Sequence, residues 1–237
     1  MKIQALGVGG AFSPQLGNSS FIIWNDKKTD GTLVDCGSSV FAILESNQLI
    51  DKINTVFITH LHSDHAGSLD TFLQYRRFVS KKKTRVLELP RILKYLREID
   101  PGYEDNLREY FDMTPANYEW DSYMVKHCPN MEARALGTKD ILISGDTDSS
   151  LLSITAATAK KTKVIFHDVS FKKRPSKDDV HAHYLDLVRA KDSVKAKTWL
   201  YHYNYGDFSE YSTQVKRDGF AGLLMTGQEI VVKQDEN

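Results

Sequence analysis

The sequence predicts a single α/β domain, and three features of the chain support this prediction. Short β-type runs alternate with helical patterns along most of the 237 residues. This length is within reach of one large α/β domain, which buries roughly 70–75% of its extended-chain surface. No repeat and no linker-like stretch divides the chain. We therefore expect one domain over residues 1–237.

The expected strands are short runs separated by Gly, Asn and Asp turn signals. They cover residues 2–8, 20–24, 31–37, 54–60, 84–89, 123–127, 140–146, 163–168, 197–203 and 229–232. Helical patterns cover residues 40–50, 91–99, 149–160 and 178–194. Residues 100–120 are polar and aromatic without a clear period, so we interpret them as an excursion or a lid.

Composition excludes several classes of protein. Lys+Arg and Asp+Glu balance at 31 each, so the overall charge does not indicate a nucleic-acid partner. Two cysteines, Cys36 and Cys128, are too few for a disulfide framework and indicate a reducing compartment. No apolar run approaches 18 residues, and residues 1–13 contain no sustained apolar stretch. We expect a cytoplasmic globular protein with no membrane association.

The segment "FITHLHSDHAGSLD" (57–70) places His60, His62, Asp64 and His65 in one loop. A single histidine is by default a core or surface residue. Four such groups cannot be buried together without partners, because each unpaired polar group costs several kcal/mol. A metal supplies the partner, and imidazole with carboxylate suits Zn, with Mn or Fe as alternatives. The loop offers too many ligands for one tetrahedral ion with an open position, which favours a two-metal site.

Other histidines and aspartates lie at the ends of expected strands. These residues are His127, Asp146, His167, Asp168 and His202. Loops that follow strands are where a rigid scaffold presents functional groups. We therefore expect these residues to contribute to the same site.

The motif "THLHSDH" resembles the T-H-x-H-x-D-H signature of the metallo-β-lactamase superfamily. "LVDCG" (33–37) resembles the strand-ending Asp-Cys-Gly of that superfamily, and His127, Asp146 in "SGDTD" (144–148) and His202 resemble its later motifs. "LGVGGAFSPQLGNSS" (6–20) resembles the opening of its ribonuclease Z-like branch. The resemblance implies an αββα sandwich, in which two mixed β-sheets pack face to face with helices outside.

By residue, the resemblance implies two divalent metal ions, with Zn²⁺ expected and Mn²⁺ as the alternative. One ion would be bound by His60, His62 and His127. The other would be bound by Asp64, His65 and His202. Asp146 would bridge the two ions. Asp35 would orient a ligand, or it is simply a turn residue. Because the ligand set is full, we expect Cys36 and Cys128 to be small buried hydrophobes.

The segment 164–187 resembles the part of ribonuclease Z in which a histidine and an acidic residue form a pair. His181 matches that histidine and Asp168 its partner, although the branch usually has Glu there. A departing ribose oxygen needs a proton, which a histidine bound to a carboxylate can donate. His183 is the alternative, but two positions further along a helix it would face away. The expected catalytic residues are therefore Asp64, His181 and Asp168.

Ribonuclease Z binds tRNA with an arm inserted between the counterparts of His127 and Asp146. Only residues 128–145 lie between them here, mostly expected as strand and turn. The basic run 76–85 favours RNA, although such runs are more often solvated loops. Compact, armless relatives include the phage anti-Pycsar proteins, which hydrolyse cyclic nucleotide second messengers and so blunt bacterial defence, and this chain resembles them. The resemblance thus implies a 3′,5′-cyclic nucleotide phosphodiesterase. Aromatic residues of 100–120 and 201–208 could stack on the base of such a substrate, although each one taken singly is expected to pack in the core.

Two alternatives remain open: an RNA 3′-processing endonuclease and a non-catalytic binding module of the same fold. Thioester or β-lactam hydrolysis fits less well, because a carbonyl substrate has no obvious use for Asp168 and His181. Relatives in this branch are dimers, so we expect a homodimer acting on a small substrate with no stable nucleic-acid partner. The sequence assigns no substrate-binding residue.

Overall fold

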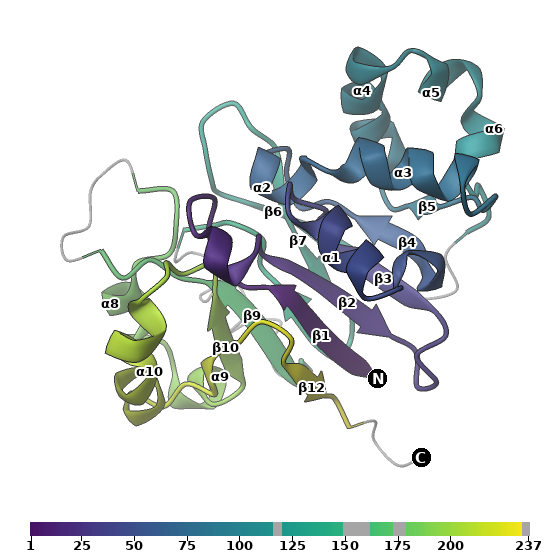
Figure 1. Ribbon diagram of the computed structural model, residues 1–237. Helices are drawn as coiled ribbons and strands as arrows, with labels where there is room; N and C mark the ends of the chain where they lie inside the picture. Colours follow the sequence, from purple (N-terminus) through teal and green to yellow (C-terminus); the bar gives the residue numbers. More distant parts are fainter. Residues whose placement is uncertain (116–119, 149–161, 173–178, 234–237) are drawn as a thin grey trace. The chain divides into compact units, whose positions relative to one another are not determined.

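The computed structural model describes residues 1–115, 120–148, 162–172 and 179–233 (Figure 1). Its strands form two six-stranded sheets. Each sheet is the centre of one compact unit. The first unit comprises residues 1–7, 18–118 and 227–237, and the second comprises residues 8–17 and 119–226.

The sheet of the first unit has the order β12-β1-β2-β3-β4-β5. Its strands are β1 (Lys2–Gly7), β2 (Ser20–Trp24), β3 (Gly31–Val34), β4 (Ile53–Phe57), β5 (Arg85–Val86) and β12 (Glu229–Val231). β12, β1, β2 and β3 pair antiparallel, whereas β3, β4 and β5 pair parallel. The sheet is therefore mixed, and its parallel part ends in the loops that follow β3 and β4.

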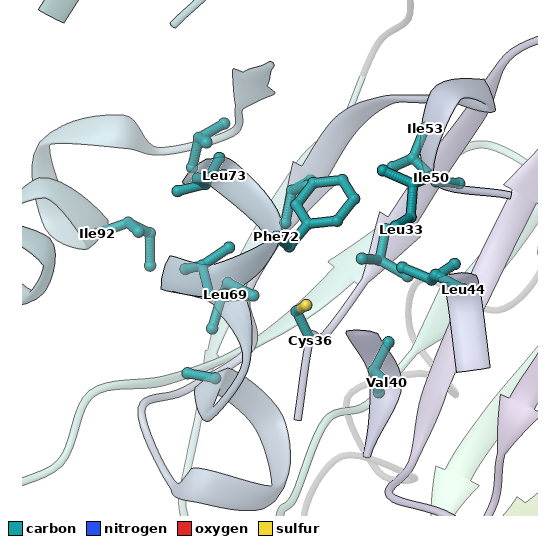
Figure 2. Close-up of a cluster of buried hydrophobic side chains, with 14 of the residues drawn as sticks. Leu33, Cys36, Val40, Leu44, Ile50, Ile53, Leu69, Phe72, Leu73 and Ile92 are labelled. Carbon is teal, nitrogen blue, oxygen red and sulfur yellow. The ribbon is translucent and has the colours of Figure 1, made fainter. Parts of the chain in front are cut away.

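Helices of the first unit cover its sheet with apolar side chains. They are α1 (Val40–Ser46), η2 (Ile50–Lys52), α2 (Ser63–Ala66), α3 (Leu69–Phe78), α4 (Leu89–Ile99), α5 (Gly102–Asp105) and α6 (Leu107–Tyr110). Figure 2 shows Leu33 of β3 beside Val40 and Leu44 of α1, with Phe72 of α3 also in the cluster. All four side chains are fully buried. This core fixes the ends of β3 and β4, from which the site loops leave.

Three aromatic side chains of 100–120 belong to this core. Tyr103 and Tyr110 are buried with ring centroids 4.4 Å apart, and Phe111 is buried next to them. The Tyr103 hydroxyl donates to Asp70 Oδ1 of α3 at 2.8 Å. These aromatic rings therefore pack the first unit, as expected for each ring taken singly.

The sheet of the second unit has the order β11-β10-β9-β8-β7-β6. Its strands are β6 (Asp121–Val125), β7 (Ala133–Gly137), β8 (Ile141–Ile143), β9 (Val164–Asp168), β10 (Thr198–Tyr201) and β11 (Gly222–Leu223). β6, β7 and β8 pair antiparallel, and β8, β9, β10 and β11 pair parallel. The ends of β8, β9 and β10, three of the four parallel strands, consequently lie along one edge.

The helices of the second unit include η1 (Pro14–Leu16), α8 (Tyr184–Leu187), α9 (Asp192–Lys195) and α10 (Asp207–Arg217). The prediction of one helix over 178–194 is wrong. Ser170 forms a β-bridge with His183: its amide donates to the Ala182 carbonyl at 2.8 Å, and its carbonyl accepts from the Tyr184 amide at 3.0 Å. The described residues 179–183 are therefore not helical, and the helix begins only at α8. The helix expected over 149–160 lies outside the described residues. Among the described helices, none is long and apolar enough to span a membrane.

Candidate metal centre and active site

Asp35 organises the site loop of the first unit. It follows β3 in a left-handed conformation, with φ of 63°, and is almost fully buried. Its carboxylate accepts hydrogen bonds from the Thr59 amide at 2.7 Å, the Thr59 hydroxyl at 2.8 Å and His65 Nδ1 at 2.7 Å. Burial raises the pKa of Asp35, and the His65 ring and the Thr59 donors act in the opposite direction. Three donors therefore fix the position of one buried carboxylate.

This network sets the tautomers of two histidines. Because the Thr59 hydroxyl gives its single proton to Asp35, it accepts from His60 Nδ1, which lies 3.1 Å away. His65 donates through Nδ1 to Asp35 as well. Both rings consequently present Nε2 as the nitrogen with a lone pair, which is the arrangement that a metal-binding histidine requires.

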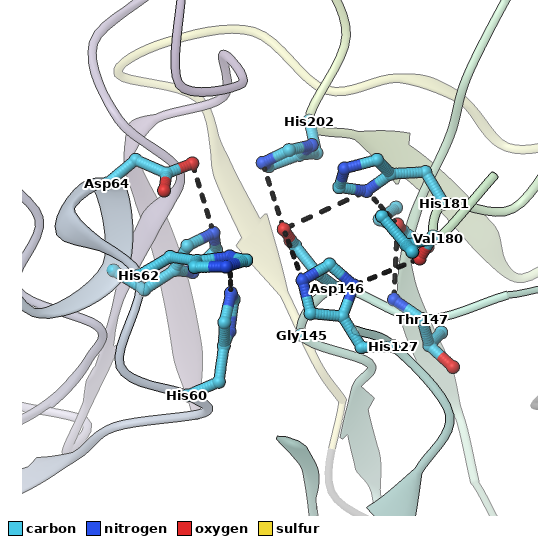
Figure 3. Close-up of polar contacts among 12 residues, drawn as sticks. His60, His62, Asp64, His127, Gly145, Asp146, Thr147, Val180, His181 and His202 are labelled. Carbon is cyan, nitrogen blue, oxygen red and sulfur yellow. Dashed lines mark hydrogen bonds and ion pairs between the residues drawn. The ribbon is translucent and has the colours of Figure 1, made fainter. Parts of the chain in front are cut away.

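The four polar side chains of the loop lie close together, and Figure 3 labels three of them, His60, His62 and Asp64. His60 Nε2 lies 3.0 Å from His62 Nδ1, and the His60 and His65 ring centroids are 4.1 Å apart. Asp64 Oδ2 lies 3.4 Å from His65 Nε2. His60, Asp64 and His65 are buried, and His62 is half-buried. The predicted gathering of these four residues is therefore present within the first unit.

Gly37 allows the end of β3 to approach this loop. A Cβ at Gly37 would lie 1.9 Å from the Asp64 carbonyl oxygen, so no other residue fits there. The neighbouring Cys36 amide donates to the His65 carbonyl at 2.7 Å. Burial raises the pKa of the Cys36 thiol to about 12, so Cys36 behaves as a small hydrophobe. Cys128 is half-buried, so the expectation of a buried hydrophobe is confirmed for Cys36 and wrong for Cys128.

Asp146 is the centre of the second unit's polar cluster. It follows β8 through Gly145, which has φ of 61°, and is only 2% exposed. Its Oδ2 lies 3.4 Å from His202 Nε2, 3.8 Å from His181 Nδ1 and 3.9 Å from His127 Nε2 (Figure 3). One carboxylate oxygen therefore faces three histidines from three different segments.

Backbone groups orient two of these histidines. His127 Nδ1 donates to the Val180 carbonyl at 3.0 Å, which leaves Nε2 as the acceptor nitrogen toward Asp146. The His202 amide donates to the Val8 carbonyl at 2.7 Å. The His202 ring lies against Gly10, where a Cβ would be 3.2 Å from its Cε1 atom. Both rings are thus positioned by chain segments that lie far from them in sequence.

Asp168 and His181 form the expected pair. His181 Nδ1 donates to Asp168 Oδ2 at 3.0 Å, and the Thr147 amide donates to the same oxygen at 3.2 Å. Asp168 is fully buried, whereas the His181 side chain is 28% exposed. A histidine that is bound to a buried carboxylate and still reaches solvent has the form of a general acid.

His183 has a different environment. Its Nε2 donates to the Lys172 carbonyl, and its Nδ1 accepts from the Leu185 amide at 3.3 Å as the N-cap of α8. His167 is buried, and its Nδ1 donates to the Asp168 carbonyl at 2.8 Å. Both rings thus bond to backbone groups. The geometry favours His181 over His183 as the partner of Asp168.

Sequence analysis did not identify several groups that position these side chains. Thr59 is the first letter of the "THLHSDH" motif, so its role could have been inferred from the motif. Ser144, whose hydroxyl accepts from the Asp168 amide at 3.1 Å, and Thr147 carry no comparable signal. The Val180 carbonyl, which accepts from His127, is a backbone group, so no pattern of side chains could predict its role. Such backbone contacts emerge only from the fold.

The side chains fit a divalent metal by their chemistry. Each unit gathers imidazole nitrogens and buried carboxylates, and these His/Asp clusters are consistent with a divalent metal site. In the second unit, ligand atoms of Asp146, Asp168 and His181 lie within 4.8 Å of one another. Buried carboxylates need a compensating cation, which a metal ion provides. Nitrogen and carboxylate donors without thiolates suit several divalent ions.

Comparison with solved structures identifies the class of fold. The metallo-β-lactamase fold protein YhfI from Bacillus subtilis has a TM-score of 0.72 and 15% sequence identity, covering 97% of this chain and 98% of its own. Two mixed sheets with helices are what that fold requires. The predicted metallo-β-lactamase fold is confirmed.

The family is more specific than the fold. The family model "Anti-Pycsar protein Apyc1" matches residues 1–230, and the chain belongs to this family. The anti-Pycsar protein Apyc1 of Paenibacillus harenae is 29% identical over 231 residues, covering 86% of this chain and 90% of the relative. The anti-Pycsar protein Apyc1 of Bacillus phage BSP38 is 27% identical over 256 residues, covering 93% and 95%.

Proposed function

We propose that this protein is a metal-dependent phosphodiesterase that hydrolyses 3′,5′-cyclic nucleotides to linear nucleoside monophosphates. Family membership supports the substrate class, because the name anti-Pycsar implies degradation of a cyclic nucleotide signal. The observation that carries the reaction type is the His181–Asp168 pair, 3.0 Å apart and next to Asp146. The relative from Bacillus phage BSP38 supports a role in phage counter-defence, inside the cytoplasm of the host.

The proposal includes two divalent metal ions per chain, with Zn²⁺ preferred over Mn²⁺. His60, His62 and His127 would bind one ion. Asp64, His65 and His202 would bind the other. Asp146 would bridge them. When bound, such ions offset the charge of the phosphoryl oxygens and lower the pKa of water.

His181 would give the leaving ribose oxygen its proton. With Nδ1 donating to Asp168, the protonated ring carries a second proton on Nε2, which is available to an acceptor in the site. Asp168 fixes the ring and stabilises its positive charge before transfer. Water supplies the oxygen that forms the new bond to phosphorus. When the bond between phosphorus and the ribose oxygen breaks, that oxygen takes the Nε2 proton and becomes a hydroxyl of the linear nucleotide.

The short interval between His127 and Asp146 supports a small substrate. Residues 133–137 form β7, and residues 141–143 form β8, so this interval is a compact antiparallel connection. It contains no inserted arm that could bind tRNA. We propose a small cyclic nucleotide as the substrate. The same proposal includes a homodimer with no stable nucleic-acid partner.

The test is a substrate panel with purified protein. It contains 3′,5′-cyclic mononucleotides of purines and pyrimidines, cyclic dinucleotides and a pre-tRNA, with products identified by ³¹P NMR and gel electrophoresis. Linear monophosphates from the cyclic mononucleotides, absent with the His62→Ala variant, would support the proposal. Cleavage of pre-tRNA with inert cyclic nucleotides would instead establish the RNA-processing endonuclease. Binding without turnover of any substrate would establish the binding module.

A further inference from the structure

Two exposed aromatic side chains lie on neighbouring loops of the second unit. Phe12 is 95% exposed and Tyr205 is 68% exposed. By contrast, Tyr201 and Tyr203 from the second aromatic segment are buried, as are Tyr103 and Tyr110 from the first. Of these rings, only Phe12 and Tyr205 are open to a ligand.

Hydrogen bonds connect the two loops. The Ser13 amide donates to the Gly10 carbonyl at 3.1 Å, so Ala11 and Phe12 occupy the tip of a tight turn. The Ser13 hydroxyl lies 3.4 Å from Asn204 Oδ1 and accepts from the Tyr205 amide at 3.3 Å. The turn that carries Phe12 is thereby fixed to the segment that carries Tyr205.

The same loops contact the polar cluster of the second unit. Gly10, two residues before Phe12, packs against the His202 ring, and its amide donates to the Tyr203 carbonyl at 3.4 Å. Tyr205 follows His202 by three residues. His202 Nε2 lies 3.4 Å from Asp146, so the loops that carry the two rings adjoin the polar cluster at which the proposed function places the phosphate.

We propose that Phe12 stacks on the nucleobase of the substrate, with Tyr205 beside it on the same rim. This inference rests on the proposed function. In a nucleoside 3′,5′-cyclic phosphate the base projects away from the phosphate, so it needs a partner at the edge of the site. An exposed aromatic face is such a partner, and because every base has a π-face, stacking tolerates different bases. Phe12 therefore stacks on both purines and pyrimidines, and it binds purines more tightly.

The test compares Phe12→Leu, which keeps an apolar side chain but removes the ring, with Phe12→Trp, which keeps a ring. The measured quantity is the ratio of KM for a purine 3′,5′-cyclic nucleotide to KM for abasic ribose 3′,5′-cyclic phosphate. Loss of one stack predicts that Phe12→Leu raises this ratio about 5- to 100-fold while kcat changes little. Phe12→Trp keeps the ratio near that of the wild type. Phe78→Leu, a change at an exposed ring of the first unit, is the matched control.

A second readout does not depend on turnover. In the Phe12→Trp variant, a nucleoside monophosphate should quench the fluorescence of the introduced indole, whereas ribose 5-phosphate should not. The quenching in the variant should exceed the quenching of wild-type fluorescence by the same nucleotide. An active wild-type enzyme with an unchanged KM ratio in Phe12→Leu would overturn the inference and leave the proposed function intact. A wild type without phosphodiesterase activity would overturn the proposed function, whatever the quenching. A changed molecular mass of Phe12→Leu in light scattering would assign Phe12 to a subunit contact and overturn the inference.

Discussion

His181 and His183 differ in what their nitrogens contact, although they are two residues apart. His181 donates to a buried carboxylate and keeps 28% of its side chain exposed, whereas both nitrogens of His183 bond to backbone groups. We predict that His181→Ala lowers kcat by about 10²–10⁴, the usual contribution of a positioned general acid. Metal content should stay unchanged, as measured by elemental analysis alongside steady-state kinetics.

Three controls separate proton donation from other roles of His181. An activated aryl oxide leaves a phosphodiester without needing a proton. On such a substrate His181→Ala should therefore recover most of its lost activity, whereas His62→Ala should not. Asp168→Ala should lose less than His181→Ala, and the double variant little more, because the pair acts as a unit. An equal loss on both substrates would mean that His181 stabilises phosphate charge. A selective defect in His183→Ala would mean that His183 is the acid.

Asp35 contacts His65 directly and His60 through the Thr59 hydroxyl. We predict that Asp35→Ala weakens metal binding about 10- to 100-fold, because the partners of ligating histidines set their tautomers and orientation. Titration of chelator-treated protein with Zn²⁺ measures this change. Asp51→Ala, an exposed carboxylate of the same unit, is the control and should bind as the wild type does. An unchanged Zn²⁺ affinity in Asp35→Ala would show that Asp35 is only a turn residue and does not orient the metal ligands.

At the residue scale, sequence analysis succeeded where the chemistry is local. His60, His62, Asp64 and His65 belong to one loop, so their spacing alone predicts that they gather. The choice between His181 and His183 rested on helical spacing, although residue 181 precedes the helix. Ser170 pairs with His183, and this pairing fixes the segment that precedes the helix. Because the pairing depends on the tertiary fold, helical spacing could not predict it.

At the element scale, most strands were predicted near their observed positions because their residues are apolar and β-branched. Helix α3 was not anticipated, because its end overlaps the basic run 76–85. Arg76 is buried in that helix, with its guanidinium donating to Asn54 Oδ1 and to the Lys83 carbonyl. Strand β11 has two residues and pairs only with β10, so no sequence period could reveal it.

The helices α5 and α6 attach to the first unit through one aromatic cluster. Tyr103 is fully buried, stacks near Tyr110 and donates to Asp70. We predict that Tyr103→Ala lowers the free energy of unfolding by about 3–5 kcal/mol through the cavity it leaves. Tyr103→Phe keeps the ring and should cost only about 1 kcal/mol for the lost hydrogen bond.

Urea unfolding followed by fluorescence and circular dichroism measures both Tyr103 variants. The exposed Met113→Ala serves as the control and should change stability by less than about 0.5 kcal/mol. Equal effects of Tyr103→Ala and Met113→Ala would show that these helices do not contribute to the core.

At the scale of the whole molecule, the expected ligands are divided between the two units. The first unit contributes His60, His62, Asp64 and His65. The second contributes His127, Asp146 and His202. In the proposed assignment each ion would take ligands from both sets, and we therefore predict that metal binding links the stability of the two units. The single domain expected from the sequence stays a prediction, and so does the homodimer.

Metal removal tests that linkage. A ligand that binds only the folded state stabilises it by about 2.7 kcal/mol at 100 times its dissociation constant. We therefore predict that chelator-treated protein melts at a lower temperature in calorimetry, with the two units no longer unfolding in one transition. Re-addition of Zn²⁺ should restore a single transition and saturate at two equivalents per chain. Asp146→Ala, which lacks the proposed bridge, should bind neither ion tightly and should melt like the metal-free protein with or without Zn²⁺. Saturation at one equivalent in active protein would contradict the bridged pair, and a melting temperature that ignores metal would show that the ions do not link the units.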